Sequence, residues 1–71
     1  METRELVKVQ SYLRKVFGAK TLSVRARPKI KDSAEVYVGD DFVGTITRDD
    51  EDGELCYQFQ MAILEMDLED A

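Results

Sequence analysis

The sequence predicts a small α+β domain in which an N-terminal helix packs on one face of a four-stranded antiparallel meander sheet. Near the N-terminus, apolar residues recur every three or four positions, as they do on one face of a helix. From residue 21 onward, short segments alternate apolar and polar side chains and are separated by turn residues. Strands that follow one another this closely pair as antiparallel neighbours, and one face of such a sheet can be covered by the helix. The 71 residues allow a single domain, 1–71.

The helix is predicted over residues 3–17. Thr3 is expected as its N-cap, and Gly18 can adopt the left-handed conformation that ends a helix. The face expected to pack on the sheet carries Leu6, Val9, Leu13, Val16 and Phe17.

Three strands are predicted over residues 21–28, 34–38 and 42–47. The alternation favours pairing Val38 with Phe42, Val36 with Gly44 and Ala34 with Ile46, which leaves residues 39–41 as a loop beside a bulge. Gly44, in mid-strand, indicates the close approach of a large neighbour, for which Phe17 is one candidate.

The fourth strand follows an acidic turn over residues 48–54 and is predicted from residue 55 to residue 63. Residues 60–68 also fit helical spacing, so strand and helix both stay open there. An acidic tail over residues 65–71 is expected to be frayed or weakly helical.

Composition narrows the classes of function. Fifteen acidic against ten basic residues give a net charge of −5, which disfavours non-specific binding to nucleic acid or anionic membranes. No apolar run approaches the ~20 residues of a membrane helix, and the charged N-terminus is unlike a signal peptide. We therefore expect a cytoplasmic protein. Small domains are often reinforced by a disulfide, a metal ion or a partner subunit. One cysteine cannot form an internal disulfide, and the absence of histidine gives no sign of a metal site, so a partner subunit remains.

Two blocks of the sequence resemble a known family. They are A-E-V-Y-V-G-D-D-F-V-G-T-I and D-E-D-G-E-L-C-Y-Q-F-Q-M-A-I-L, and the likeness extends over nearly the whole chain, including the helix and the A-R-P-K that ends the first strand. The sequence is similar to short alphaproteobacterial proteins classed as domain of unknown function 3126. The resemblance implies a bacterial, cytoplasmic protein with no assigned activity, and it supplies no catalytic or binding residue.

A basic row is the first candidate site. Its members, spaced by two in an extended chain, are Arg25, Arg27, Lys29 and Lys31. Such a row could bind phosphates, nucleic acid or an acidic partner. The alternative is structural, because Arg25 falls opposite Glu35 in the predicted register and lysines at a sheet edge discourage aggregation.

The outer face of the sheet is the second candidate. It would present a mixed apolar patch of Tyr37, Val43, Thr45, Cys56 and Leu64. Contiguous patches of this type mark protein contacts, although the same residues are also good strand formers.

Reactive chemistry is not indicated. The acidic turn lacks the ligand pattern of a calcium loop, with Arg48 and Phe59 where carboxylates would be needed, so no metal site is predicted. Cys56 has no histidine to activate it, and no cofactor motif is present.

We expect a non-enzymatic protein-interaction module, self-associating or bound to another protein through the outer face or a strand edge. The alternative is a weak nucleic-acid or anionic-ligand binder that uses the basic row.

Overall fold

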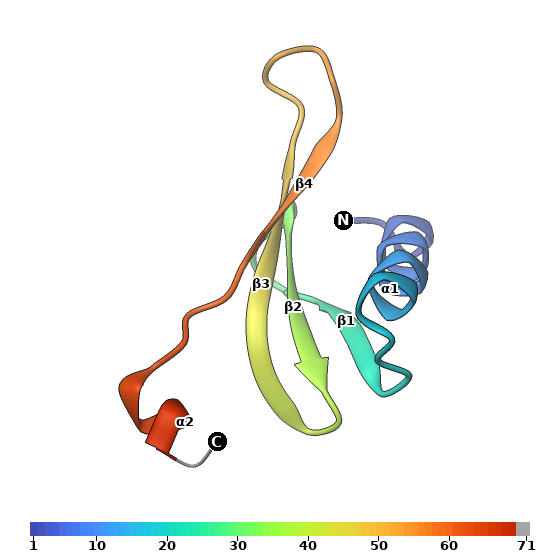
Figure 1. Ribbon diagram of the computed structural model, residues 1–71. Coiled ribbons are helices and arrows are strands. Elements are labelled where there is room, and N and C mark those ends of the chain that lie inside the picture. Colours follow the sequence, from blue (N-terminus) through green and yellow to red (C-terminus); the bar gives the residue numbers. More distant parts are fainter. Residues whose placement is uncertain (70–71) are drawn as a thin grey trace.

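The computed structural model of the chain describes residues 1–69 and shows a helix beside a four-stranded sheet, with a short second helix near the C-terminal end (Figure 1). In chain order the elements are α1 (Thr3–Phe17), β1 (Leu22–Ala26), β2 (Ser33–Val38), β3 (Asp41–Asp49), β4 (Cys56–Gln60) and α2 (Glu65–Glu69). The strands lie in the order β1-β2-β3-β4, each antiparallel to the next. The predicted fold class is confirmed. Neither described helix has the length and apolar character needed to cross a bilayer.

Helix α1 has the predicted bounds but a different cap. Its N-cap is Glu2 and not Thr3, and the Glu2 backbone N–H donates to the Glu5 carboxylate at 3.1 Å, as in a capping box. At the other end Gly18 has a φ of 63° and its N–H donates to the carbonyl of Arg14, which terminates the helix as expected.

The β2–β3 hairpin contains the expected bulge and a shorter loop. Ala34 pairs with Ile46 and Val36 with Gly44 as predicted, but the register then shifts. Phe42 pairs with Tyr37, and Val38 pairs with Asp41, so the predicted Val38–Phe42 pair is wrong. The loop shrinks to Gly39 and Asp40, with a positive φ of 63° at Gly39, the position that takes glycine in a type II′ turn.

The bulge exchanges the faces of two neighbouring residues. Phe42 turns to the outer face, where its ring meets that of Tyr37 edge-on at a centroid distance of 5.7 Å. Val43, half-buried, packs against the hydrophobic core on the helix side. Placing Val43 on the outer face was therefore wrong, because the extra residue of a bulge reverses the alternation beyond it.

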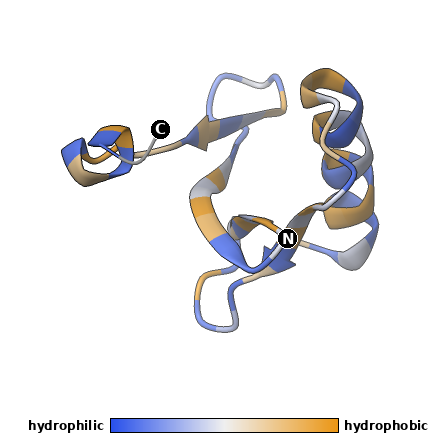
Figure 2. Cartoon of the chain, turned by 60° about the horizontal axis from the view of Figure 1, so that its bottom comes forward, coloured by the Kyte–Doolittle hydropathy of each residue, from blue (hydrophilic) through white to orange (hydrophobic). Residues whose placement is uncertain are grey.

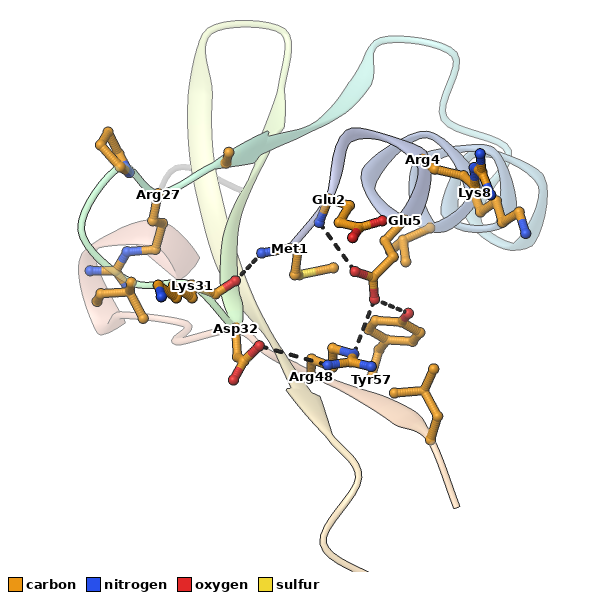
Figure 3. A pocket seen from close by; sticks show the side chains of 15 residues that line it. Met1, Glu2, Arg4, Glu5, Lys8, Arg27, Lys31, Asp32, Arg48 and Tyr57 are labelled. Atoms are coloured by element: carbon orange, nitrogen blue, oxygen red, sulfur yellow. Dashed lines mark hydrogen bonds and ion pairs between the residues drawn. The ribbon is translucent and has the colours of Figure 1, made fainter. Parts of the chain in front are cut away.

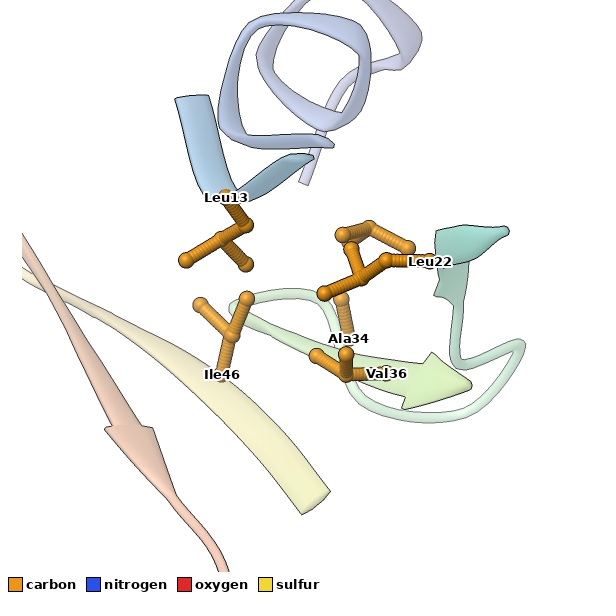
Figure 4. Packing of buried hydrophobic residues seen from close by; sticks show 6 residues of the cluster. Leu13, Leu22, Ala34, Val36 and Ile46 are labelled. Atoms are coloured by element: carbon orange, nitrogen blue, oxygen red, sulfur yellow. The ribbon is translucent and has the colours of Figure 1, made fainter. Parts of the chain in front are cut away.

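The core lies between α1 and the inner face of the sheet. Its buried members are Leu13, Leu22, Val24, Ala34, Val36 and Ile46. Leu13 points from α1 toward Ile46, and Leu22 points toward Ala34 and Val36 (Figure 4). α1 packs chiefly against β1, which leaves much of its far flank uncovered. Val16 and Phe17, expected in the core, are exposed for this reason.

Two α1 side chains cover the free edge of β1. The Gln10 side-chain carbonyl accepts a hydrogen bond from the Val24 N–H at 3.1 Å, and the Arg14 Nε donates to the Leu22 carbonyl at 2.6 Å. An open strand edge is a template for pairing with other chains, and these bonds occupy two backbone groups of β1 that such pairing would use.

The two edge strands of the sheet, β1 and β4, are shorter than predicted. β1 ends at Ala26, because a turn follows in which the Ile30 N–H donates to the Arg27 carbonyl at 3.3 Å. β4 ends at Gln60 and not at residue 63. Gln60 pairs with Thr45, beyond which the bulge carries β3 away, so residues 61–64 have no ladder partner.

The C-terminal segment, residues 61–69, leaves the sheet on the side away from α1 (Figures 1 and 2). It ends in the five-residue helix α2, at Glu65–Glu69. The Leu64 N–H donates to the Asp67 carboxylate at 3.0 Å and caps this helix. The rest of the predicted tail, residues 70–71, lies outside the described residues.

Candidate functional site

A polar cluster lies under the first turn of α1, on the inner face of the sheet (Figure 3). The Tyr57 hydroxyl donates to Glu5 Oε2 at 2.6 Å, and Arg48 Nε lies 3.1 Å from the same oxygen. Arg48 also approaches Asp32 at 3.9 Å and Asp50 at 3.8 Å. The cluster thus joins α1, the end of β3 and β4 at one point.

The charges of this cluster stabilise one another. The hydrogen bond from Tyr57, the Glu2 N–H and the charge of Arg48 lower the pKa of Glu5 below its ordinary 4.5. The bond to Glu5 raises the pKa of Tyr57 above 10.0, and the Glu5 charge raises the pKa of Arg48. A carboxylate that is harder to protonate and a phenol that is harder to ionise are poorly suited to acid–base chemistry at neutral pH. The cluster therefore acts as a clamp between helix and sheet.

Sequence reasoning missed this cluster. The predicted acidic turn includes Arg48, whereas the structure places it in β3 opposite Tyr57. A signal was present: continuing the alternation from Gly44 and Ile46 puts Arg48 on the inner face. A charge on an inner face requires a partner, and Glu5 at the helix start supplies it.

The basic row does not form one surface. Arg25 lies opposite Glu35 as predicted, and its guanidinium sits over the Tyr37 ring at 4.1 Å on the outer face. Because β1 ends at Ala26, the other three residues belong to a turn and the spacing argument fails for them. Arg27 and Lys31 instead border a hollow of about 840 Å³ beside the start of α1, here called the N-terminal hollow.

The cations of the N-terminal hollow are spread around it. Figure 3 shows Arg27 and Lys31 at one end and Arg4 and Lys8 at the other, with the paired Arg48 between them. Three carboxylates, those of Glu2, Glu5 and Asp32, share the same lining. The five positive side chains do not converge on one point.

The residues of the predicted outer patch are not contiguous. Tyr37 lies between Arg25 and Phe42, and its hydroxyl donates to the Glu35 carboxylate at 3.4 Å. Cys56 is a free, exposed thiol opposite Asp49, with the Gln58 amide 3.5 Å from its sulfur. It lies four β3 positions from Thr45, about 13 Å along the strand. Thr45 and Leu64 do share a hollow, which Phe42 also lines.

An apolar groove, which sequence reasoning did not predict, opens between α1 and β4. It has a volume of about 380 Å³; α1 contributes Val9, Tyr12 and Leu13 to its lining, and the sheet contributes Ile46, Tyr57 and Phe59. The Phe17 ring meets the Phe59 ring edge-on, with their centroids 6.2 Å apart. The groove exists because α1 leans toward β1 and leaves the inner face of β4 only partly covered.

The acidic turn shows ordinary turn geometry. The Glu51 N–H donates to the Asp49 carboxylate at 3.2 Å, and Gly53 has a φ of 82°. Within residues 1–69, no three histidine, cysteine or carboxylate side chains are grouped so that they could hold a metal ion.

Fold and surfaces together define a small α+β domain, an open meander sheet covered by one helix, which leaves many large apolar side chains exposed. The chain belongs to the family described as protein of unknown function (DUF3126), whose model matches residues 5–67. A search of curated proteins and a search of solved structures each found no match.

Proposed function

We propose that this chain is a non-enzymatic protein-interaction module of the cytoplasm of alphaproteobacteria. The observation that supports this proposal is the number of large apolar side chains that are exposed on so small a chain. Among the described residues, six hydrophobic side chains are buried, whereas the exposed large ones are Val7, Tyr12, Val16, Phe17, Ile30, Val38, Phe42, Leu55, Met61, Ile63, Leu64, Met66 and Leu68. Single exposed apolar residues are ordinary, but clusters of them mark contact sites.

Many of these exposed residues lie in two places. One is the open flank of α1, where Tyr12 and Phe17 adjoin the apolar groove. The other is the C-terminal segment, where all nine side chains are exposed and five of them are large and hydrophobic. These two surfaces, more than the outer sheet face, support an interaction function.

The absence of histidine and the state of the remaining polar groups support the non-enzymatic part of the proposal. Glu5, Arg48 and Tyr57 are engaged with one another. Cys56 lies opposite Asp49 and beside Gln58, and the chain has no histidine to activate its thiol. A nucleophile needs an adjacent base or a cationic environment to be activated.

The test is sedimentation of the intact chain from about 10 μM to about 1 mM, together with capture experiments that use Tyr12→Asp as the matched control bait. Tyr12 is 65% exposed, so the substitution removes apolar surface without disturbing the core. An interaction module should self-associate, or should retain a partner that Tyr12→Asp loses. A chain that stays monomeric throughout and retains nothing selectively would refute the proposal.

An anionic ligand at the N-terminal hollow is the second candidate. Five basic side chains against three acidic ones line it, in a chain whose net charge is −5. Because the cations are spread out, an extended polyanion suits this arrangement better than a single phosphate. Titration with tripolyphosphate, followed by the amide signals of Arg27 and Lys31, separates this candidate from the first. Saturable shifts that disappear in Arg27→Gln would support it, and unchanged spectra at low salt would exclude it.

A further inference from the structure

The C-terminal segment and the apolar groove are matched surfaces of the same chain. We propose that residues 61–69 of one copy dock into the groove between α1 and β4 of a second copy, and that the exchange is mutual. This inference rests on the proposed interaction function and names its partner.

The C-terminal segment lacks the contacts that would stabilise it alone. Met66 and Leu68 are 65% and 63% exposed, and α2 has five residues, whereas isolated helices shorter than about 12 residues are marginal in water. Docking on an apolar surface would supply the missing contacts, since most helical stability in proteins comes from packing.

The apolar groove offers a surface of this kind. Its lining is apolar apart from Lys8 and the Tyr hydroxyls, and its volume of about 380 Å³ is at the lower end of the range that takes small ligands or a few side chains. Tyr12, at its helical border, is among the most exposed hydrophobic side chains in the described part of the chain.

Charge complementarity favours this pairing. α1 carries four cations against the single carboxylate of Glu5, which the clamp already engages. Arg4, Lys8 and Lys15 fall with Tyr12 on one stripe of α1, at helical spacings of four, four and three. The C-terminal segment has Glu65, Asp67 and Glu69 and no basic residue. Apolar side chains flanked by acids thus meet an apolar groove flanked by bases.

Geometry favours a second copy over the chain's own groove. The C-terminal segment leaves on the side of the sheet opposite α1 (Figure 2), so it points away from the groove that its own chain forms. Two copies that each give one segment and accept one form a closed pair with two-fold symmetry, which requires no third component.

The first experiment measures dimerisation by sedimentation for the intact chain and for Leu68→Asp. Leu68 is exposed in the single chain, so the thermal melt at low concentration should be unchanged while self-association weakens about tenfold or more. Ile30→Asp, the same change at an exposed apolar residue outside both surfaces, is the control and should dimerise normally.

The second experiment is complementation. Leu68→Asp lacks a competent segment and Tyr12→Asp lacks a competent groove, so each alone should be monomeric at a concentration where the intact chain dimerises. Their mixture should form heterodimers, seen by native mass spectrometry, because one intact segment can still enter one intact groove. Absence of heterodimers would overturn the mutual exchange.

The outcomes separate the two proposals. Dimers that Leu68→Asp leaves intact would overturn the docking mode while the interaction function stands. A chain that is monomeric up to about 1 mM removes the second copy as occupant. A spin label is placed at Ala62→Cys in a Cys56→Ser background, and these chains are mixed with chains that carry ¹⁵N but no spin label. The label should broaden the amide signals of Val9 and Tyr12 in the ¹⁵N chains. Broadening confined to the labelled chain itself would show that the segment folds back, and would overturn the proposal.

Discussion

The Tyr57 hydroxyl donates a hydrogen bond to the Glu5 carboxylate at 2.6 Å, which joins the first turn of α1 to the last strand of the sheet across 52 positions of the chain. Arg48 approaches the same oxygen from β3. A contact between residues so distant in sequence forms only when helix and sheet are docked. The clamp is therefore a direct probe of the fold.

The clamp makes stability depend on pH in acid. The pKa of Glu5 is lower in the folded chain than its ordinary 4.5, so its contribution is complete above that value and is lost as the pH falls through the folded-state pKa. We predict that the unfolding free energy, measured in urea from about pH 7 down to about pH 3, falls less steeply in Glu5→Gln than in the natural chain. Glu51→Gln, in the exposed turn, should keep the natural slope.

The same bond predicts the opposite dependence in alkali. The pKa of Tyr57 is raised chiefly by its bond to Glu5, so this contribution is complete below 10.0 and is lost as the pH rises through the folded value. In Glu5→Gln the Tyr57 ring signals should titrate at lower pH than in the natural chain. An unchanged titration would mean that the bond does not persist in solution.

The sequence was sufficient for the regular parts of this fold. Period-three-to-four spacing located α1 to the residue, and period-two alternation gave four strands in the right order with the Ala34–Ile46 register. Both patterns arise because one face of each element must be buried. The existence of the bulge was also predicted.

The errors share a cause. The exact position of the bulge determines which face of the sheet Phe42 and Val43 occupy. An error of one residue in that position exchanged their predicted faces. The neighbour of Gly44 is not Phe17: a methyl group there would meet the Gln60 carbonyl oxygen and would lie 2.7 Å from Phe59 Cε1. The groove and the clamp depend on where α1 lies across the sheet, which no local pattern encodes. Such placement is set by packing between distant segments.

The bond from Val24 to Gln10 predicts a local effect of Gln10→Ala. Without the side-chain carbonyl, the Val24 N–H at the β1 edge loses its partner, at a cost of about 1 kcal/mol. Hydrogen exchange at the Val24 amide should therefore accelerate about tenfold, more than exchange at amides within the β2–β3 ladder. Ser11→Ala, an exposed change on the same helix, should leave Val24 protected.

Gly44 is required for close strand packing. Because a methyl group would collide with the Gln60 backbone and the Phe59 ring, Gly44→Ala should destabilise the fold by about 1–3 kcal/mol in urea unfolding. Gly39 has open space around its Cα, so a side chain there would meet no atom and would be opposed only by the positive φ of 63°. Gly39→Asn should therefore cost about 1 kcal/mol, less than the loss at Gly44. Equal losses at the two sites would show that β4 does not approach Gly44 in solution.

The face exchange at the bulge is tested by placing the same polar side chain at two adjacent residues. Val43 packs against the core, so Val43→Asn brings an amide against apolar surface and should cost about 2 kcal/mol or more. Phe42 is exposed and loses only its edge contact with Tyr37, so Phe42→Asn should cost about 1 kcal/mol or less. Urea unfolding of the two variants decides between the registers. A register without the shift puts Phe42 inside and Val43 outside, and it predicts the reverse order of stabilities. Because both variants introduce asparagine, at adjacent positions that each hold a good strand former, differences in strand propensity are small beside this effect.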